Sequence, residues 1–208
     1  MRVIYGDLWQ IDGFHVVPTN LTTRRDGTAI IGRGVAKQAT LRYPTLESDY
    51  GQFLQGQQTC LSSRQAASLY LDLDQRLICL PVKRHWADRA DLALIASGVQ
   101  QLAALPARIA PVVFPLLGCG FGERSPREVL PLLETFLREE RFILVLRDDV
   151  ATRRHAATLR PGACVDQAAL RDLARLQSTP ERRRLTQVLP CTATPECERL
   201  APPEWEEE

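Results

Sequence analysis

Up to about residue 147, segments with short apolar runs alternate with segments whose apolar residues recur at helical spacing. Short apolar runs bounded by turn residues predict strands, at residues 1–5, 14–18, 67–73, 76–82, 110–117 and 142–146. Apolar residues at helical spacing predict helices between them, at residues 34–42, 45–55, 88–105 and 126–139. Strands that alternate with helices favour a three-layer α/β/α sandwich. The central sheet should be mixed, because residues 67–73 and 76–82 form a hairpin turning at Asp74 and Gln75.

Residues at the predicted helix ends agree with these assignments. Ser125 precedes Pro126 at the first helical position, and Glu128 completes a capping box. Asp88 is expected to cap the preceding helix. The apolar residues expected on or near one face of the helix at 34–42 are Val35, Ala39 and Leu41.

Composition narrows the class of protein. With 208 residues and a formal charge of +1, the chain can bury one α/β domain and has no general attraction to nucleic acid. It has neither a signal-peptide core nor an apolar run near the roughly 20 residues that span a bilayer, so we expect a cytoplasmic protein without a membrane partner. Six cysteines without a CxxC spacing and three histidines argue against a metal site.

Two glycine-rich turns each follow a predicted strand and precede a helix. One holds Gly118, Gly120 and Gly122, and the other holds Gly32 and Gly34. Such turns bring backbone N–H groups close to a ligand and suit a phosphate or pyrophosphate. Because ligands of open α/β folds bind at the carboxyl ends of strands, the two turns can form two walls of one cleft. The alternative is that both are only tight turns.

A third loop with chemical character follows the predicted strand at 76–82. Lys83 is one of only two lysines in the chain and could serve as a nucleophile or an electrostatic clamp. Arg84 and His85 could hold a phosphate or a DNA backbone, and Trp86 could stack on a base. The alternative is an exposed polar loop with Trp86 packed beneath it.

Three further polar residues lie near the predicted strand ends. Asn20 could orient a ribose hydroxyl or form an Asx turn. Asp7 could accept a hydrogen bond from an adenine amino group or cap the segment that follows the first strand. Glu123, the acid inside a glycine turn, could be a general base or favour the helix N-terminus electrostatically.

The character of the chain changes at about Asp148. Arginine, proline, alanine and glutamate dominate the remainder, which includes the cluster at residues 181–184 and the acidic segment at 204–208. We therefore expect a domain over residues 1–147. Residues 148–208 would form a C-terminal extension with one short helix at 166–176 and then an irregular tail.

Taken in order along residues 1–147, these elements resemble a macro domain. The specific ones are the Lys83-Arg84-His85-Trp86 segment and the Gly118-Cys119-Gly120 turn, at this order and spacing. The resemblance is greatest to the branch with the DNA ADP-ribosyl glycohydrolase antitoxin and the terminal ADP-ribose protein glycohydrolase. It implies a three-layer α/β/α sandwich with an ADP-ribose cleft.

The resemblance also implies roles for individual residues. Asp7 and Leu8 would meet the adenine, Asn20 the distal ribose, and Lys83 would be catalytic. The residues that would wrap the pyrophosphate and distal ribose are Gly32, Gly34, Val35, Ala36, Gly118, Cys119, Gly120, Phe121 and Gly122. The further substrate contacts would come from Arg84, His85, Trp86 and Glu123.

The same resemblance points to a function. It implies a mono-ADP-ribosyl glycohydrolase that needs no cofactor, with DNA bases as the leading substrate, because Gly122 stands where the protein-directed relative has an aspartate. Two alternatives stay open: a non-catalytic reader of ADP-ribose, and an interaction module that binds a toxin partner through its tail. We expect a monomer. Residues 22–28, a longer insertion than those relatives carry, would be a lid or a selectivity loop.

Overall fold

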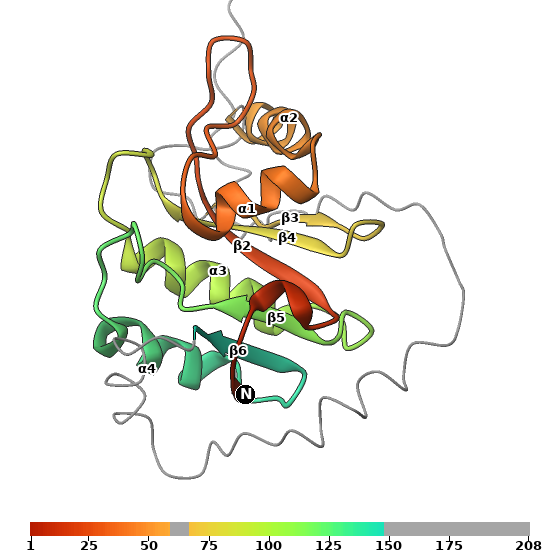
Figure 1. Ribbon diagram of the computed structural model, residues 1–208. Coiled ribbons are helices and arrows are strands. Elements are labelled where there is room, and N and C mark those ends of the chain that lie inside the picture. The colour runs from red at the N-terminus through yellow and green to blue at the C-terminus, as the bar shows by residue number, and fades with distance from the viewer. Residues whose placement is uncertain (59–66, 148–208) are drawn as a thin grey trace, which may run out of the picture.

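One six-stranded sheet forms the centre of the protein. The structure, a computed structural model, describes residues 1–58 and 67–147. The sheet has the order β1-β6-β5-β2-β4-β3 (Figure 1). Its strands are β1 (Arg2–Tyr5), β2 (Phe14–Asn20), β3 (Tyr70–Asp72), β4 (Leu77–Lys83), β5 (Val112–Pro115) and β6 (Phe142–Leu146). Only β3 runs antiparallel, in the predicted hairpin with β4, so the sheet is mixed as the sequence predicts.

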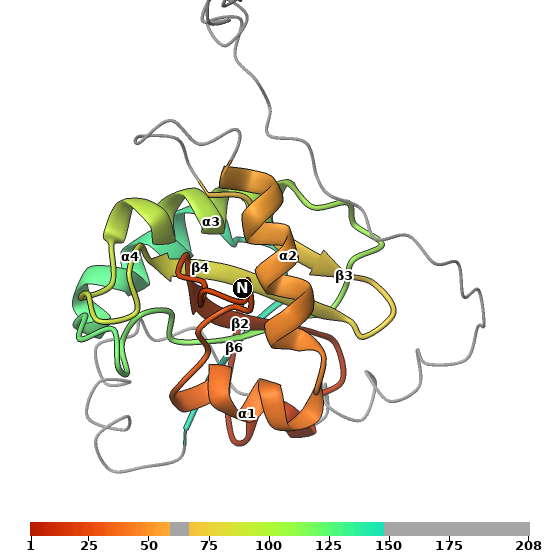
Figure 2. The same ribbon diagram turned by 90° about the horizontal axis from the view of Figure 1, so that it is seen from above.

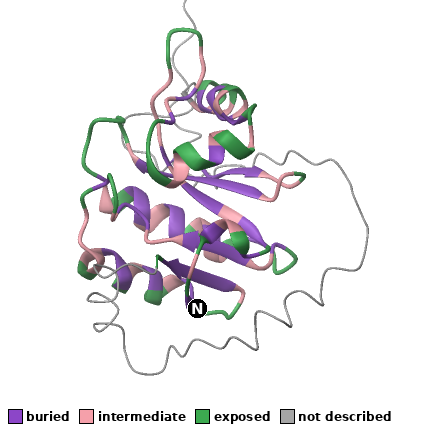
Figure 3. Cartoon of the chain, viewed as in Figure 1, coloured by how far each residue is buried: buried purple, intermediate pink, exposed green. Residues whose placement is uncertain are grey.

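Helices cover both faces of this sheet (Figure 2). They are η1 (Leu8–Gln10), α1 (Gly34–Arg42), α2 (Leu46–Gln58), α3 (Leu92–Ala104) and α4 (Pro126–Phe136). The neighbours Val16 and Val17 in β2 enter two different cores, one with α3 and α4 and the other with α1 and α2. Because successive strand residues point to opposite faces, this alternation requires a helix layer on each side, and the strands are buried (Figure 3). The predicted three-layer sandwich is confirmed.

Two predictions about the helices need correction. The helix after the third loop is capped by Asp91, whose Oδ1 accepts from the Ala93 amide at 2.8 Å, and not by Asp88. Asp88 instead accepts from the His85 amide at 3.2 Å inside the loop. Leu41 is 72% exposed, whereas Ala39 is buried. Residues two positions apart in an α-helix point in directions about 200° apart around its axis, so Ala39 and Leu41 cannot both face the same core.

The capping box of α4 is confirmed. The Ser125 side chain accepts from the Arg127 amide at 3.3 Å, and Glu128 accepts from the Ser125 amide at 2.8 Å.

Of the described helices, none is long and apolar enough to cross a membrane. The proposed extension at 148–208, with its helix at 166–176, lies outside the described residues.

The parallel strands bring their carboxyl ends to one edge of the sheet. Gly6, just after β1, donates its amide to the carbonyl of Leu146 in β6 at 2.9 Å. At the other side, the β2–β4 register shifts between Thr19 and Asn20, so that Asn20 lies opposite Lys83. Such a bulge redirects side chains at the end of a strand, and here it places Lys83 at the sheet edge beside Asn20.

Candidate functional site

A cleft of about 1190 Å³ lies along this sheet edge. Every residue expected to bind the ligand lines it: Asp7, Leu8, Asn20, Gly32, Gly34, Val35, Ala36, Lys83, Gly118, Cys119, Gly120, Phe121 and Gly122. Trp86 and Glu123 line it too, whereas Arg84 and His85 are not among its lining residues. The three loops that the sequence singles out therefore converge on one cleft.

Two glycines of the second turn are required by its backbone. Gly118 has φ +71°, and a Cβ atom there would lie 2.9 Å from Ala90 Cβ and from Ile95 Cδ1. At Gly122 a Cβ would collide with the carbonyl oxygen of Gly118. Gly120 differs, because it is exposed and, among the residues that the structure describes, a Cβ there would meet nothing within 4 Å. Its lack of a side chain leaves open space in the cleft.

A network of arginines and one carboxylate holds this turn. Arg124 donates from Nε to the Ala90 carbonyl at 2.6 Å and pairs with Glu128 at 3.1 Å. Arg89 donates from Nε to the Glu123 carbonyl at 3.0 Å. The hydrogen bond from the Ser125 amide lowers the pKa of Glu128, which favours the carboxylate in these contacts. The turn is thus tied to α4 and to the segment before α3.

The first glycine turn leads into a helix start without a capping side chain. The N-cap residue of α1 is Arg33, and its side chain makes no capping hydrogen bond. By contrast, Asp91 caps α3 and Ser125 caps α4. The first amides of a helix have no partner inside it. At α1 these amides belong to Gly34, Val35 and Ala36, which line the cleft.

Lys83 joins the third loop to the second glycine turn. Its Nζ donates to the carbonyl oxygen of Phe121 at 2.6 Å and to that of Trp86 at 3.4 Å. The side chain is half-buried, so the amine is held at the cleft wall by two acceptors. Lys83 and the second glycine turn lie on the same side of the molecule, as a shared site requires.

The rest of the third loop is only partly as expected. Trp86 is 52% exposed, so the alternative in which it packs beneath the loop is wrong. Its amide donates to Thr22 Oγ1 at 3.1 Å, which connects the insertion at 22–28 to this loop. Arg84 pairs with Asp91 at 3.3 Å, and His85 accepts from the Ala87 amide at 3.3 Å.

Asp7 and Asn20 both have structural roles beside their place in the cleft. Asp7 Oδ1 accepts from the Trp9 amide at 3.0 Å and caps η1. Asn20 Oδ1 accepts from the Thr22 amide at 2.8 Å, which makes the Asx turn, and its Nδ2 donates to the Ile30 carbonyl at 2.8 Å. An amide nitrogen carries two hydrogens, so Asn20 keeps one donor for a ligand.

Cys119 is unsuited to nucleophilic chemistry. Burial raises the pKa of its thiol to about 12, and the negative charge of Glu128 adds to the effect. A thiol is a poor nucleophile until it is ionised. Within the described residues, no group of three or more His, Cys, Asp or Glu side chains is placed to hold a metal ion.

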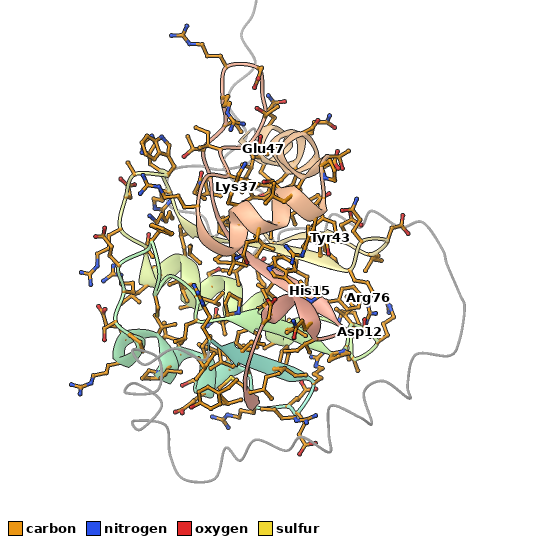
Figure 4. The ribbon with its side chains drawn as sticks, in the orientation of Figure 1. Asp12, His15, Lys37, Tyr43, Glu47 and Arg76 are labelled. Carbon is orange, nitrogen blue, oxygen red and sulfur yellow. The ribbon has the colours of Figure 1, made fainter. Side chains whose placement is uncertain are left out.

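One set of residues that positions the cleft, around His15, is not indicated by any pattern in the sequence. His15 donates from Nε2 to the Ile11 carbonyl at 2.9 Å and packs against Trp9, with ring centroids 5.1 Å apart and the ring planes tilted by 39°. Asp12 and Arg76, paired at 2.8 Å, lie beside it (Figure 4). Burial lowers the pKa of His15. These contacts hold η1, whose Leu8 lines the cleft.

Further residues line the cleft at the ends of parallel strands, a place that the sequence pattern could have indicated. Pro115, Leu116, Leu146 and Arg147 line the cleft because they end the parallel strands β5 and β6 or directly follow them. Their place after a predicted parallel strand would have been sufficient to nominate them. Tyr50 does not line the cleft but supports it from α2, because it makes a hydrogen bond of 2.9 Å with the lining residue Thr19. Its place in the sequence, far from any strand end, does not indicate this role.

Comparisons with known proteins agree on the fold. No family model matches the chain, and neither does any curated protein sequence. Among solved structures, the macrodomain of Mycobacterium tuberculosis DarG is similar, with 24% identity and a TM-score of 0.56, covering 69% of this chain and 96% of that one. The macrodomain of Thermus aquaticus DarG shows 20% identity and a TM-score of 0.54, covering 71% of this chain and 97% of that one.

A third similar structure is Thermosipho africanus DarTG in complex with ADP-ribose. It shows 20% identity and a TM-score of 0.56, covering 70% of this chain but only 41% of the DarTG chain. Each of these identities is below 25%, and the likeness is one of fold. The chain has the macrodomain fold, as the resemblance in its sequence implies.

Proposed function

We propose that the chain binds ADP-ribose in this cleft and hydrolyses the glycosidic bond between ADP-ribose and a macromolecule, with DNA bases as the leading substrate. Binding is supported by the fold shared with a structure described as a complex with ADP-ribose. It is also supported by the cleft, whose volume of about 1190 Å³ exceeds the roughly 300–1,000 Å³ of ordinary small-molecule sites.

The cleft offers a fitting group for each part of ADP-ribose. The amides at the start of α1 and the turn at 118–122 would hold the pyrophosphate, since helix starts and glycine turns present N–H groups to anions. Asp7 and Leu8 would contact the adenine at the β1 end of the sheet edge. Asn20 and Lys83, adjacent across the β2–β4 ladder, would lie at the distal ribose.

The observation that carries the catalytic proposal is the position of Lys83. Its amine lies 2.6 Å from a carbonyl oxygen of the turn at 118–122, and Lys83 lies opposite Asn20, where the distal ribose would bind. A positioned proton donor or nucleophile there is worth about 10²–10⁴-fold in rate. An amine in this place can act on the bond that joins the ribose to its acceptor.

Two routes give a balanced reaction. In the first, the Lys83 ammonium gives a proton to the departing base as the C1–N bond breaks, and water adds to C1 and loses a proton. In the second, the neutral amine attacks C1 as the C1–N bond to the base breaks, and the new ammonium gives a proton to the departing base. Water then supplies a hydroxyl group to C1 and a proton to the lysine nitrogen, which releases the sugar. The first route fits the contacts of Nζ, because an ammonium has three N–H donors and keeps one for the departing base beside its two carbonyl acceptors. Glu123, which lines the cleft, is the candidate acceptor of the water proton.

Two features favour a DNA base over a protein side chain as the acceptor. Gly122 leaves no carboxylate at the place where the protein-directed relative carries its aspartate. Trp86 is half exposed and lines the cleft beside Lys83, where its ring can stack on an unpaired base.

The test is release of ADP-ribose from two substrates. Single-stranded DNA with ADP-ribosylated bases and a glutamate-linked ADP-ribosyl peptide are incubated with the chain, and free ADP-ribose is followed by chromatography. We expect release from the DNA, a loss of about 100-fold or more in Lys83→Ala, and no change in Lys37→Ala. Lys37 is the matched control, because it lies on α1 and does not line the cleft. Release from neither substrate would contradict catalysis.

A non-catalytic reader of ADP-ribose is the second candidate, and one observation favours it. The contacts of the Lys83 amine with two carbonyl oxygens also describe a structural tie between two loops. For a reader, the wild type binds ADP-ribose and releases none from either substrate. The binding and release measurements together therefore distinguish the two functions.

A further inference from the structure

The two glycine turns meet across the cleft through Arg33 and Phe121. The Arg33 guanidinium carbon lies 5.3 Å from the centroid of the Phe121 ring. The same ring would lie 3.4 Å from a Cβ atom on Gly34. Both side chains line the cleft and both are exposed. Arg33 therefore stands where the two turns come together.

The charged side chains of the cleft differ in how they are engaged. Asp7 caps η1, and Lys83 donates to two carbonyl oxygens. For the side chain of Arg33, the described part of the chain provides no hydrogen bond or ion pair, only the contact with the Phe121 ring. A guanidinium carries five N–H donors in a planar fork that matches two phosphate oxygens. Its donors remain available to a ligand.

The position of Arg33 specifies which ligand group it can meet. It directly precedes the uncapped amides of α1 and faces the turn at 118–122. These are the two elements that would hold the pyrophosphate. A contact between guanidinium and ring at an exposed site is weak, whereas hydrogen bonds from a guanidinium to phosphate are among the strong ones. It is therefore favourable for the Arg33 guanidinium to leave the Phe121 ring and bind the phosphate oxygens.

We propose that Arg33 is a specificity-determining residue that binds the diphosphate of the ligand, exchanging its contact with Phe121 for the phosphate oxygens. This proposal rests on the proposed binding of ADP-ribose in the same cleft. It makes the diphosphate, and not only the adenine or the riboses, a required part of the ligand. It also makes affinity sensitive to salt, because an exposed ion pair is screened by counterions.

The test is calorimetric titration of the full chain with ADP-ribose at low and at high salt. We expect Arg33→Gln to bind roughly tenfold to hundredfold more weakly than the wild type at low salt, and to show a smaller salt dependence. Arg33→Lys, which keeps the charge without the fork, should retain the salt dependence and lose part of the affinity. Lys37→Gln, which removes a charge from the same helix outside the cleft, should bind as the wild type does.

The outcomes separate this proposal from the one on which it rests. If the wild type gives no heat with ADP-ribose, both proposals fail. If the wild type binds and Arg33→Gln binds within about twofold of it, only the role of Arg33 is refuted. An affinity loss with an unchanged salt dependence would also refute it, because a packing role does not involve charge. Arg33 is exposed, so all variants should keep the wild-type melting temperature, which confirms that they fold.

Discussion

Alanine at Gly118 should lower the stability of the fold and alanine at Gly120 the affinity for the ligand, although the two glycines are only two residues apart. Gly118 has φ +71° and contacts Ala90 and Ile95, where a Cβ would approach to 2.9 Å. Gly120 lines the cleft, and a Cβ there would meet no atom of residues 1–58 and 67–147 within 4 Å. The first substitution therefore strains the fold, and the second places a methyl group in the space proposed for the ligand.

The magnitudes follow from these contacts. At Gly118, left-handed backbone costs alanine about 1–2 kcal/mol and the overpacked methyl about 1–3 kcal/mol. The free energy of unfolding should fall by about 2–5 kcal/mol, which lowers the melting temperature by about 4–20 °C. At Gly120, the free energy of unfolding should change by less than about 0.5 kcal/mol. A clash of about 1.4 kcal/mol or more with the ligand weakens its affinity at least tenfold.

The assay combines urea unfolding with calorimetric titration of ADP-ribose for both variants. Gly56→Ala serves as the matched control, because Gly56 lies in α2, does not line the cleft, and a Cβ there meets no atom of the described residues within 4 Å. That variant should bind normally and gain about 0.5–1 kcal/mol in stability from helix propensity. The reasoning is refuted if Gly120→Ala binds ADP-ribose as tightly as the wild type, or if it unfolds as easily as Gly118→Ala.

Three further predictions concern stability and reactivity. Burial lowers the pKa of His15, so the folded protein disfavours the imidazolium. The contribution of His15 to stability should therefore be full above the ordinary imidazole pKa of about 6.5 and fall as the pH drops below it. Urea midpoints measured against pH should show this fall, and His15→Gln should lose it. Cys119, with a pKa of about 12, should react slowly with iodoacetamide at neutral pH, and rapid modification mapped to it by mass spectrometry would contradict its burial. Asp91→Ala should lower the free energy of unfolding by about 1 kcal/mol, because α3 loses its cap. Asp88→Ala should lower that free energy by less. Equal losses in urea unfolding would argue against Asp91 as the cap.

Much of the fold follows from local patterns in the sequence. The parallel strands, the hairpin of β3 and β4, and the capping box of α4 all rest on periods and spacings within a few residues. The convergence of three loops also follows, because the carboxyl ends of parallel strands share one sheet edge. The choice between Asp88 and Asp91 did not follow, since both acids stand at suitable spacing and the length of the loop decides between them.

The site depends more on contacts between distant segments. Gly118 and Gly120 look alike in the sequence, and only the packing of Ala90 and Ile95 against one of them separates their roles. The hydrogen bond from Lys83 to Phe121 spans 38 positions, and the contact of Arg33 with Phe121 spans two separate turns. No local pattern reports such contacts, so a sequence can nominate these residues without revealing how they are held.

A crystal structure of the full chain with ADP-ribose would show whether the cleft binds this ligand as proposed. We expect one ligand molecule, with its diphosphate between the amides of residues 34–36 and the turn at 118–122. Its distal ribose should lie beside Lys83, and the Arg33 guanidinium on the phosphate oxygens. A ligand bound away from this sheet edge, or a diphosphate out of reach of both glycine turns, would contradict it.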